Sequence, residues 1–464
     1  MSFQEKKSSG DDDTIVAVIT PPGEGGIAAL RLAGPKSLAL LNRFYRPAYH
    51  KHKQFSPFLL RYGYFTAAGG EIIDEVTAVY MPAGDSYTGL EQAEIFCHGG
   101  RQVVRMLLDE LVRAGARPAE PGEFTKLAFL NGRIDLTRAE AVADMVAANT
   151  EVSLRVSREH LLGAFSRHID NLRRELIKII ADVEASIDFP DEEIVTPEQS
   201  ELLAALDRVL EKIEELAASY TGGRIVREGF QVAIGGRPNA GKSSLFNLLL
   251  KQERALVTPA PGTTRDYLSE WIDLEGIAVN LIDTAGLREK GSAVEKSGHE
   301  RALKIFKNSD LIIWLADLSS RGWKRRLEED LKRLEENIIM LVGNKIDLVK
   351  DYKKTIVACP EMLPVSCLTG AGLKKLKSDL VKRINEKMPD LTSGMVVTSV
   401  RHQQKLEQAI KNIKSARKKI ESEESPEFTA FDLNLAAKAL DEITGKVYNE
   451  QILEEIFSRF CIGK

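Results

Sequence analysis

The spacing of apolar residues changes along the chain, and the spacings predict three kinds of region. Residues 14 to about 133 are rich in Gly and Pro and carry short apolar runs such as DTIVAVI and EVTAVYM, which predicts a mixed α and β domain. From Ile134 to Phe189 proline is absent and apolar residues recur at helical spacing. From about residue 229 the strand candidates FQVAIGG, IAVNLID, LIIWLAD and IIMLVGN alternate with helical stretches. This alternation predicts a doubly wound α/β domain with a mostly parallel sheet.

One helix can be delimited from its flanking residues. The stretch TPEQSELLAALDRVLEKIEELAA has Thr196 as its candidate N-cap, Pro197 as the first helical residue and Gln199 as the capping-box partner. Gly222 and Gly223 are expected to end this helix.

The economical interpretation is an α/β domain inserted into a helical domain whose two parts flank it in sequence. The helical pattern returns from Val397, first in TSVRHQQKLEQAIKNIKSARKKIESEE and then in FDLNLAAKALDEITGKV and NEQILEEIFSRF. We therefore expect an N-terminal domain at 1–133, a first helical part at 134–227, the α/β domain at 228–385 and a second helical part at 386–464.

Composition narrows the class of protein without deciding its partners. Lys plus Arg total 64 and Asp plus Glu total 68, so the formal net charge of −4 neither favours nor excludes a nucleic-acid partner. No apolar run approaches the length of a membrane span, and the N-terminal MSFQEKKSSGDDD lacks the apolar segment of a secretory signal. The four cysteines, Cys97, Cys359, Cys367 and Cys461, lack metal-ligand spacing. We therefore expect a reduced, cytoplasmic protein.

A phosphate-binding loop is predicted by GGRPNAGKSS, which matches G-x-x-x-x-G-K-[ST] from Gly236 to Ser243. The alternative is a chance glycine-rich turn, but the motif follows the strand candidate QVAI and precedes the helix candidate SSLFNLLL, as the function requires. We expect Lys242 to reach the β and γ phosphates and the Ser243 hydroxyl to bind Mg²⁺. The other nucleotide-binding candidates here are Asn239, Ala240, Gly241 and Ser244.

The motif NKID indicates that the base is guanine. The carboxylate of Asp347 can accept two hydrogen bonds from the N1–H and the exocyclic amine of guanine, a pair that adenine does not offer. Asn344 and Lys345 would frame the base edge and the ring face, and Ser366 in VSCLTG would belong to a last base-contacting loop. NKID alone is a weak signal, but its place after a strand and beyond a phosphate loop makes it specific.

The motif DTAG lies between these two and is typical of the switch region of a GTPase. Asp283 would hold Mg²⁺ through water, and the Gly286 N–H would contact the γ-phosphate. Thr264, in VTPAPGTTRDY, is the candidate second protein ligand of Mg²⁺, although simple solvation of a Thr-Thr pair is the alternative. Many GTPases place a water-orienting glutamine directly after DTAG, whereas this chain has Leu287. These residues alone do not show what orients the water.

The motifs GRPNAGKSS, GTTRD, DTAGLR, NKID and the C-terminal FCIGK together resemble the MnmE family of tRNA modification GTPases, also called TrmE. So do DTIVAVITPPGEGGIAALRLAG, YTGLEQAEIFCHGG, RPAEPGEFTKLAFLNGRIDL and DFPDEEI, and the resemblance extends from Asp13 to Lys464. It implies a Ras-like doubly wound GTPase domain inserted in an α-helical domain and preceded by an α+β folate-binding domain. Several of these motifs are not shared with GTPases at large, so the resemblance is specific.

The resemblance implies how water and charge are handled. In the family a glutamate downstream of DTAG sets the water, and its position matches Glu295, which the residues alone would suggest is a solvated helix residue. K⁺ takes the place of an arginine finger there, and Asn239 matches the K⁺-binding asparagine. The remaining K⁺ ligands would be Thr258, Ala260 and Thr263, at least partly through backbone carbonyls. The family orders this loop when two GTPase domains meet face to face.

The N-terminal region is similar to the family domain that binds a tetrahydrofolate derivative, such as the 5-formyl or the methylene form. Arg31, Glu94 and Arg133 match its ligand contacts, and Lys464 matches the contact made from the other end of the chain. A carboxylate can bind the donor edge of the pterin while cations meet the glutamate tail. The family often carries lysine where Arg133 stands, which keeps the charge but changes the geometry. Without the resemblance each of these residues would be interpreted as a surface charge.

The resemblance also gives weight to Cys461, because in the family this cysteine lies near the folate site and is needed for tRNA modification. Its role as a nucleophile, a transient carrier or a positioning residue stays open. The implied protein is a homodimer that works with MnmG, a flavin and NADH enzyme. Together they would install a (carboxymethyl)aminomethyl group on carbon 5 of the wobble uridine of certain tRNAs, with the one-carbon unit from folate and GTP hydrolysis driving conformational change.

Two other functions and one surface remain open at this point. The chain could be an RNA-binding ribosome-assembly GTPase switch, or a folate-dependent transferase that acts on proteins or small molecules. The predicted helix at 401–420 carries a run of cations that is either a solvated face or an RNA contact. These cations are Arg401, Lys405, Lys411, Lys414, Arg417, Lys418 and Lys419.

Overall fold

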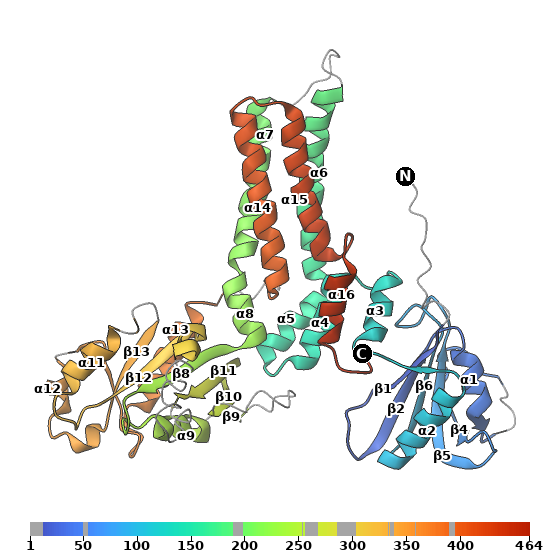
Figure 1. The fold of residues 1–464 in the computed structure, drawn as a ribbon, viewed down its shortest axis with the longest axis horizontal. Coiled ribbons are helices and arrows are strands. Elements are labelled where there is room, and N and C mark those ends of the chain that lie inside the picture. Colours follow the sequence, from blue (N-terminus) through green and yellow to red (C-terminus); the bar gives the residue numbers. More distant parts are fainter. Residues whose placement is uncertain are drawn as a thin grey trace, which may run out of the picture. The chain divides into compact units, whose positions relative to one another are not determined.

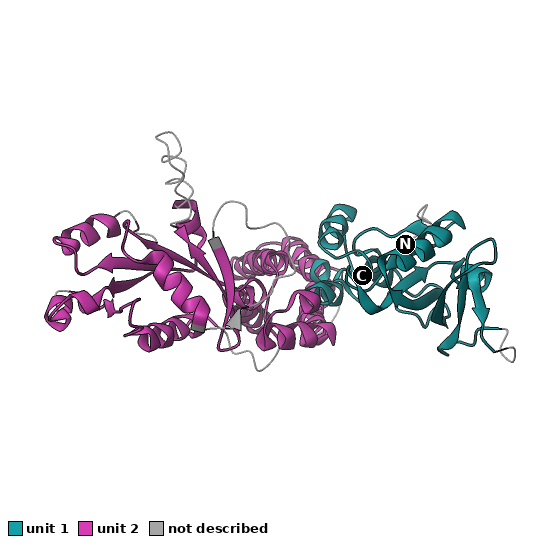
Figure 2. Ribbon diagram, turned by 90° about the horizontal axis from the view of Figure 1, so that it is seen from below, with its two compact units in different colours: residues 1–143, 441–464 teal, residues 144–440 magenta. Residues whose placement is uncertain are grey.

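The structure is a computed structural model that describes residues 13–49, 54–188, 198–252, 254–255, 268–284, 303–332, 334, 338–357, 359–388 and 395–464. The chain divides into two compact units (Figure 2). The first unit comprises residues 1–143 together with 441–464, and the second comprises residues 144–440. Each unit is described by itself, with the element labels of Figure 1.

The described residues of the first unit form a seven-stranded sheet in the order β3-β4-β5-β6-β2-β1-β7. Neighbouring strands are antiparallel except for β1 and β7, which are parallel. The strands are β1 (Ile15–Val18), β2 (Gly25–Ala33), β3 (Tyr45–Pro47), β4 (Arg61–Thr66), β5 (Ile72–Met81), β6 (Gln92–Gly99) and β7 (Arg117–Pro118).

Helices pack against both faces of this sheet because strand side chains alternate in direction. Val16 of β1 joins the core that contains residues of helices α1 (Ser37–Phe44) and α2 (Arg101–Arg113). Its neighbours Ile15 and Ala17 instead pack with Phe124 of α3 (Glu123–Leu130). The side of β1 that faces α3 is therefore the side that carries the candidate folate residues described below.

The C-terminal segment completes the first unit. Helix α16 (Glu450–Ser458) and the residues after it bury Leu453, Phe457 and Phe460 with Phe129 of α3 and Leu136 of α4 (Leu136–Ala147).

The last residues of the chain lie against α3 and β1. Ile462 forms an isolated bridge with Pro121, and the backbone N–H of Phe124 donates to the carbonyl of Lys464 at 3.1 Å. Gly463 has φ of +98°, and a Cβ there would lie 2.6 Å from the Val18 carbonyl oxygen, so the close approach requires glycine.

The second unit begins with a helical part whose two segments are far apart in sequence. Figure 1 shows α6 and α7 beside α14 and α15, so these helices come from both sides of the inserted α/β domain in sequence. The helices of this part are α5 (Glu151–Leu161), α6 (Ala164–Asp188), α7 (Gln199–Ala218), α8 (Tyr220–Glu228), α14 (Val400–Glu421) and α15 (Pro426–Thr444). The buried residues of α7 and α14 recur at helical spacing, as in Leu206, Val209 and Ile213.

The prediction that Gly222 and Gly223 end the helix is wrong. The helix α7 ends at Ala218, and both glycines lie inside α8. The physical reason for glycine is a close crossing, because a Cβ at Gly223 would lie 2.1 Å from the Val397 carbonyl oxygen. Thr196 and Pro197 lie outside the described residues, but α7 begins at Gln199 and its N-cap is Glu198, so the helix starts two residues later than predicted and Gln199 is not a capping-box partner.

The inserted α/β domain has a seven-stranded sheet in its described residues, in the order β14-β13-β12-β8-β11-β10-β9. The pairs among β14, β13, β12, β8 and β11 are parallel, and β10 and β9 extend the sheet antiparallel. The strands are β8 (Phe230–Gly236), β9 (Arg254–Ala255), β10 (Leu268–Leu274), β11 (Ile277–Asp283), β12 (Leu311–Asp317), β13 (Ile339–Asn344) and β14 (Leu363–Pro364). This confirms the predicted mostly parallel sheet.

Two helices that are far apart in sequence pack on the same face of this sheet. Leu245 and Leu249 of α9 and Leu376 and Leu380 of α13 pack with strand residues such as Val232, all nearly inaccessible to solvent. The helices of this domain are α9 (Lys242–Gln252), α11 (Trp323–Leu331), α12 (Tyr352–Ile356) and α13 (Leu373–Asn385), with the 3₁₀ turn η2 (Ile346–Leu348).

Candidate functional site

The nucleotide-binding candidates gather at one edge of the α/β sheet. The phosphate loop follows β8, Asp283 is the last residue of β11, and Asn344 is the last residue of β13. Ser366 follows the short strand β14. Since β8, β11, β13 and β14 run parallel, their carboxyl ends meet at the same edge, which is where ligands bind in open α/β sheets.

The backbone of the phosphate loop takes conformations that few side chains tolerate. Gly236 has φ of +141° and Gly241 has φ of +102°, and Asn239 between them has φ of +60°. A Cβ at Gly241 would lie 2.2 Å from Nδ2 of Asn344, so the loop is pressed directly against the base-binding motif. Glycine at these positions lets the loop turn tightly enough to present its N–H groups to an anion.

Lys242 is held inside this loop. Its side chain is 8% exposed, and Nζ donates to the carbonyls of Gly236 at 3.0 Å and Arg237 at 3.1 Å. It is also the first residue of α9, so its ammonium and the helix N-terminus both contribute positive charge to the loop.

Ser243 and Asp283 supply adjacent hard oxygen ligands. The Ser243 hydroxyl donates to Oδ2 of Asp283 at 2.7 Å, and Asp283 is 1% exposed. The next residue, Thr284, donates its hydroxyl to the Ile234 carbonyl at 2.8 Å, which ties the end of β11 to β8. Mg²⁺ prefers oxygen ligands of this kind, so the pair fits a magnesium ion next to the phosphate loop.

Asn344 connects the phosphate loop to the base-binding loops. Its Nδ2 donates to the Ala240 carbonyl at 2.8 Å, and its Oδ1 accepts from the Cys367 backbone N–H at 3.1 Å. Both bonds are shielded, because Asn344 is 2% exposed. Because both the N–H and the oxygen of this buried amide are hydrogen-bonded, Asn344 fixes the distance between the phosphate loop and the base-binding loop.

Asp347 and Ser366 meet at the base-binding end. The Ser366 hydroxyl, which is fully buried, donates to Oδ1 of Asp347, while Asp347 itself is exposed. The Thr369 backbone N–H donates to the Ser366 hydroxyl at 3.2 Å, so the serine is oriented by its own loop. The carboxylate is thereby held with one face toward solvent, where a base edge could bind.

The candidate folate residues form a second cluster, in the first unit. Arg31 and Glu94 are cross-strand partners of β2 and β6, and Nε of Arg31 lies 2.9 Å from Oε1 of Glu94. The Arg31 guanidinium lies 5.6 Å from the ring centroids of both Tyr87 and Phe124. The backbone N–H of Phe124 donates to the Lys464 carbonyl, so Arg31, its partner Glu94 and the Lys464 backbone gather near this residue.

Arg133 reaches the same region through the loop that carries Tyr87. Its NH1 donates to the Gly84 carbonyl at 2.6 Å, and Asn131 donates to the Thr88 carbonyl at 2.7 Å. The Tyr87 hydroxyl bonds the Thr125 hydroxyl at 3.0 Å, and burial raises the pKa of that phenol. The cluster thus combines a carboxylate, cations and a neutral aromatic ring. This donor set fits a pterin with an acidic tail.

Cys461 lies in the same C-terminal segment as Lys464. Cys461 is exposed to solvent, and its carbonyl accepts from the Lys464 N–H at 3.3 Å. An exposed thiol is accessible to a reactant, although accessibility alone does not assign it a role.

Two sequence models match this chain, one described as the N-terminus of the GTP-binding protein TrmE, at residues 14–133, and one as the MnmE helical domain, at residues 136–461. The protein named tRNA modification GTPase MnmE from Carboxydothermus hydrogenoformans is 40% identical over 462 residues, which are 98% of this chain and 100% of that relative. The chain belongs to the MnmE family. The MnmE proteins of Aquifex aeolicus and Thermotoga maritima are 40% and 39% identical over 97% of this chain and 100% of their own length.

Part of the predicted nucleotide site falls outside the described residues. The predicted water-setting, switch and K⁺-loop residues lie outside the described residues, as does the leucine after DTAG. They are Thr258, Ala260, Thr263, Thr264, Gly286, Leu287 and Glu295. The roles predicted for them stay predictions.

Asp317 is a site residue that the sequence analysis missed. Its Oδ2 lies 2.7 Å from Nζ of Lys345 and so holds that lysine at the base-binding end. Burial acts to raise the Asp317 pKa, but the hydrogen bonds from Lys345 and Ser319 outweigh it, and the pKa lies below its usual value. The sequence did offer a signal for this residue. Asp317 ends the strand candidate LIIWLAD, next to the strand whose last residue, Asn344, begins NKID.

Arg237 was also missed, because it occupies a variable position of the phosphate-loop pattern. Nε of Arg237 lies 3.0 Å from both carboxylate oxygens of Asp330 on α11, and NH2 lies 3.0 Å from Oε2 of Glu329. The hydrogen bond to Asp330 raises the Arg237 pKa further. The Arg237 carbonyl accepts from Lys242, so the contacts of Arg237 with α11 also support the phosphate-binding lysine candidate.

The cations of α14 are partly committed to the helical bundle. Lys414 pairs with Glu214 of α7 at 2.6 Å, Arg417 with Asp207 of α7 at 2.6 Å, and Lys419 with Asp432 of α15 at 2.8 Å. These ion pairs within the helical bundle explain some of the cations on α14 without an RNA partner. No helix in the described part of the chain is long and apolar enough to cross a membrane.

Proposed function

We propose that this chain is a K⁺-activated GTP hydrolase that modifies tRNA. In this proposal it works as a homodimer with the flavoprotein MnmG in the cytoplasm. The pair adds a (carboxymethyl)aminomethyl group to carbon 5 of the wobble uridine of certain tRNAs with a folate one-carbon unit. The observation that carries the proposal is the meeting of four GTPase motifs at one sheet edge in a chain that matches tRNA modification GTPases over their whole length.

The nucleotide chemistry follows from the residues of that edge. The loop from Gly236 to Ser243 turns its N–H groups toward the phosphates, and Lys242 neutralises charge on the β and γ phosphates. Ser243 and Asp283 hold Mg²⁺, the former directly and the latter through water. When bound, Mg²⁺ screens the negative charge that develops during phosphoryl transfer.

The base is selected at the other end of the site. Asp347 accepts from the N1–H and the exocyclic amine of guanine while Ser366 orients its carboxylate. Lys345 lies along the ring face, and Asp317 keeps it there.

Water activation and charge compensation are assigned to loops beyond the described residues. In the proposal Glu295 orients the attacking water, because Leu287 has no polar atom with which to do so. Asn239 contributes its side-chain oxygen to K⁺, together with Thr258, Ala260 and Thr263, and Thr264 completes the Mg²⁺ ligands. Asn239 is exposed in the phosphate loop, so its side chain is accessible to an ion there.

The folate chemistry is assigned to the first unit. Glu94 binds the donor edge of the pterin with its partner Arg31 beside it, and Arg133 and Lys464 meet the acidic tail of the folate. The folate supplies the one-carbon unit, and Cys461 acts close to it. The proposed domains are 1–133 for folate binding and dimerisation, 134–227 and 386–464 for the helical part, and 228–385 for GTP hydrolysis.

Mass spectrometry of tRNA nucleosides tests the proposal. A strain without this gene should lose its 5-substituted wobble uridines, and the wild-type gene should restore them. The Cys461→Ser gene should not restore them, although its product should hydrolyse GTP at the wild-type rate. An unchanged nucleoside profile in the deletion strain would refute the tRNA function, and ribosome profiles would then test a role in ribosome assembly.

A further inference from the structure

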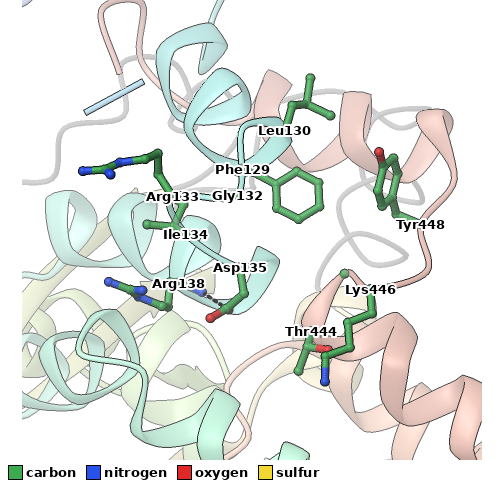
Figure 3. A pocket seen from close by; sticks show the side chains of 11 residues that line it. Phe129, Leu130, Gly132, Arg133, Ile134, Asp135, Arg138, Thr444, Lys446 and Tyr448 are labelled. Atoms are coloured by element: carbon green, nitrogen blue, oxygen red, sulfur yellow. Dashed lines mark hydrogen bonds between the residues drawn. The ribbon is translucent and has the colours of Figure 1, made fainter. Parts of the chain in front are cut away.

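The first unit contains a pocket that shares no residue with the nucleotide site and only Arg133 with the candidate folate cluster. It has a volume of about 420 Å³ and lies between the residues that connect α3 to α4 and those that connect α15 to α16 (Figure 3). Arg133, Arg138, Lys446 and Tyr448 are among its lining residues.

The charged residues that line the pocket are mostly cations. Three of the four charged lining residues are the cations Arg133, Arg138 and Lys446, and the fourth is Asp135. That carboxylate is engaged at the start of α4, because its Oδ1 accepts from the Thr137 hydroxyl at 2.6 Å and from the Arg138 backbone N–H at 3.0 Å. The pocket is therefore suited to an anion.

One wall of the pocket is aromatic. The rings of Phe129 and Tyr448 meet edge to face with centroids 5.3 Å apart, and Tyr448 is 49% exposed. Gly445 sets the position of this wall: it has φ of +81°, and a Cβ there would lie 2.7 Å from Cβ of Leu136 and 2.8 Å from the Phe129 ring. The segment that carries Lys446 and Tyr448 is thus pressed against α3 and α4.

We propose that this pocket binds one nucleotide of a single-stranded RNA loop. The base lies against Tyr448, and Arg138 and Lys446 contact the phosphodiester. Single-stranded RNA is recognised by this combination, because every base can stack on an exposed ring and every linkage carries a negative charge. The inference rests on the proposed function and deepens it, since it assigns a place to the tRNA.

The position of the pocket fits this assignment. Phe129, which forms part of its aromatic wall, belongs to the same buried cluster as Phe460, the residue directly before Cys461. A nucleotide held here would lie in the unit that also contains the folate candidates. The pocket borders the folate cluster at Arg133 but is not that cluster, since Arg31, Glu94 and Tyr87 are not among its lining residues.

Binding of an anticodon stem-loop RNA to the full-length protein tests the proposal. The double variant Arg138→Ala/Lys446→Ala should lose at least tenfold in affinity at moderate salt, and its affinity should fall less steeply with salt because two phosphate-facing charges are gone. Tyr448→Ala should lose about tenfold, whereas Tyr448→Phe, which keeps a stacking ring, should bind as wild type does.

Two controls separate the outcomes. Arg105→Ala removes an exposed cation on α2 that pairs with Asp109, and it should leave RNA affinity unchanged. GTP hydrolysis and 5-formyl-tetrahydrofolate affinity, measured on every variant, should equal those of wild type.

Three results would overturn the inference, and only one of them would also overturn the proposed function. Wild-type RNA affinity in the pocket variants would overturn it and leave the proposed function standing. An equal loss of folate and RNA binding would assign the pocket to the folate instead. Failure of the wild-type protein to bind any tRNA, together with an unchanged nucleoside profile, would remove the proposed function as well.

Discussion

The choice of base should depend on one exposed carboxylate, that of Asp347. In Asp347→Asn the amide can still accept from one ring N–H, but it places a donor opposite the guanine amine, so we expect at least a tenfold loss of GTP affinity. Xanthosine triphosphate has an acceptor at that position and should bind the variant better than GTP. Affinities of both nucleotides for both proteins measure this, and a variant that still prefers GTP would contradict the assignment.

A methyl group at Gly241 should damage the nucleotide site through Asn344. Its Cβ would lie 2.2 Å from Nδ2 of Asn344, which bridges the phosphate and base loops. We expect Gly241→Ala to weaken GTP binding by at least tenfold. Gly322→Ala is the matched control, because Gly322 also has positive φ, +71°, but its Cβ would meet nothing within 4 Å. Equal effects of the two variants on GTP affinity would show that backbone strain, and not the contact, decides the result.

Glu295 carries the prediction about water activation. Glu295→Ala should bind GTP as wild type does but lose most of the hydrolysis that K⁺ stimulates, because no other group then orients the water. Steady-state rates in K⁺ and in Na⁺ test it. Equal wild-type rates in the two salts, or an active alanine variant, would exclude this mechanism.

At the scale of elements, the tightest constraint on the helical part is the crossing at α8. Gly223→Ala would place a methyl group 2.1 Å from the Val397 carbonyl, so the segment before α14 would have to shift. We expect a loss of about 1–3 kcal/mol in the free energy of unfolding, measured by denaturant titration. Thr221→Ala, at an exposed position of the same helix, should cost far less.

At the scale of the whole molecule, the C-terminal segment from residue 441 folds with the N-terminal domain in one compact unit. The Phe124 N–H is protected by the carbonyl of Lys464, the last residue. Deleting residues 461–464 should speed hydrogen exchange at Phe124 by about fivefold, because one net hydrogen bond is worth about 1 kcal/mol. Exchange in β8 of the other unit should not change. Lys464→Ala is the control, because it keeps the backbone carbonyl and should keep the protection. Equal exchange at Phe124 in the truncated and full-length chains would contradict the contact.

Much of the α/β domain follows from the sequence because its signals are local. The four strand candidates, the phosphate loop and the helix after it are observed where apolar period and glycine spacing predict them. The predicted end at Gly222 and Gly223 failed because glycine there serves a crossing with Val397, which a local pattern cannot reveal. Asp317 and Arg237 were missed for the same reason, since their partners lie on other elements.

The sequence by itself determined the kinds of element and the chemistry each motif can perform, because periodicity, glycine and donor type act over a few neighbouring residues. It also placed the chain near the MnmE family through motifs spread from end to end. Only the tertiary structure decided which of these residues meet: Asn344 with Ala240, Arg31 with Phe124, and Tyr448 with Phe129. Such meetings depend on how distant elements pack, and no local spacing encodes them.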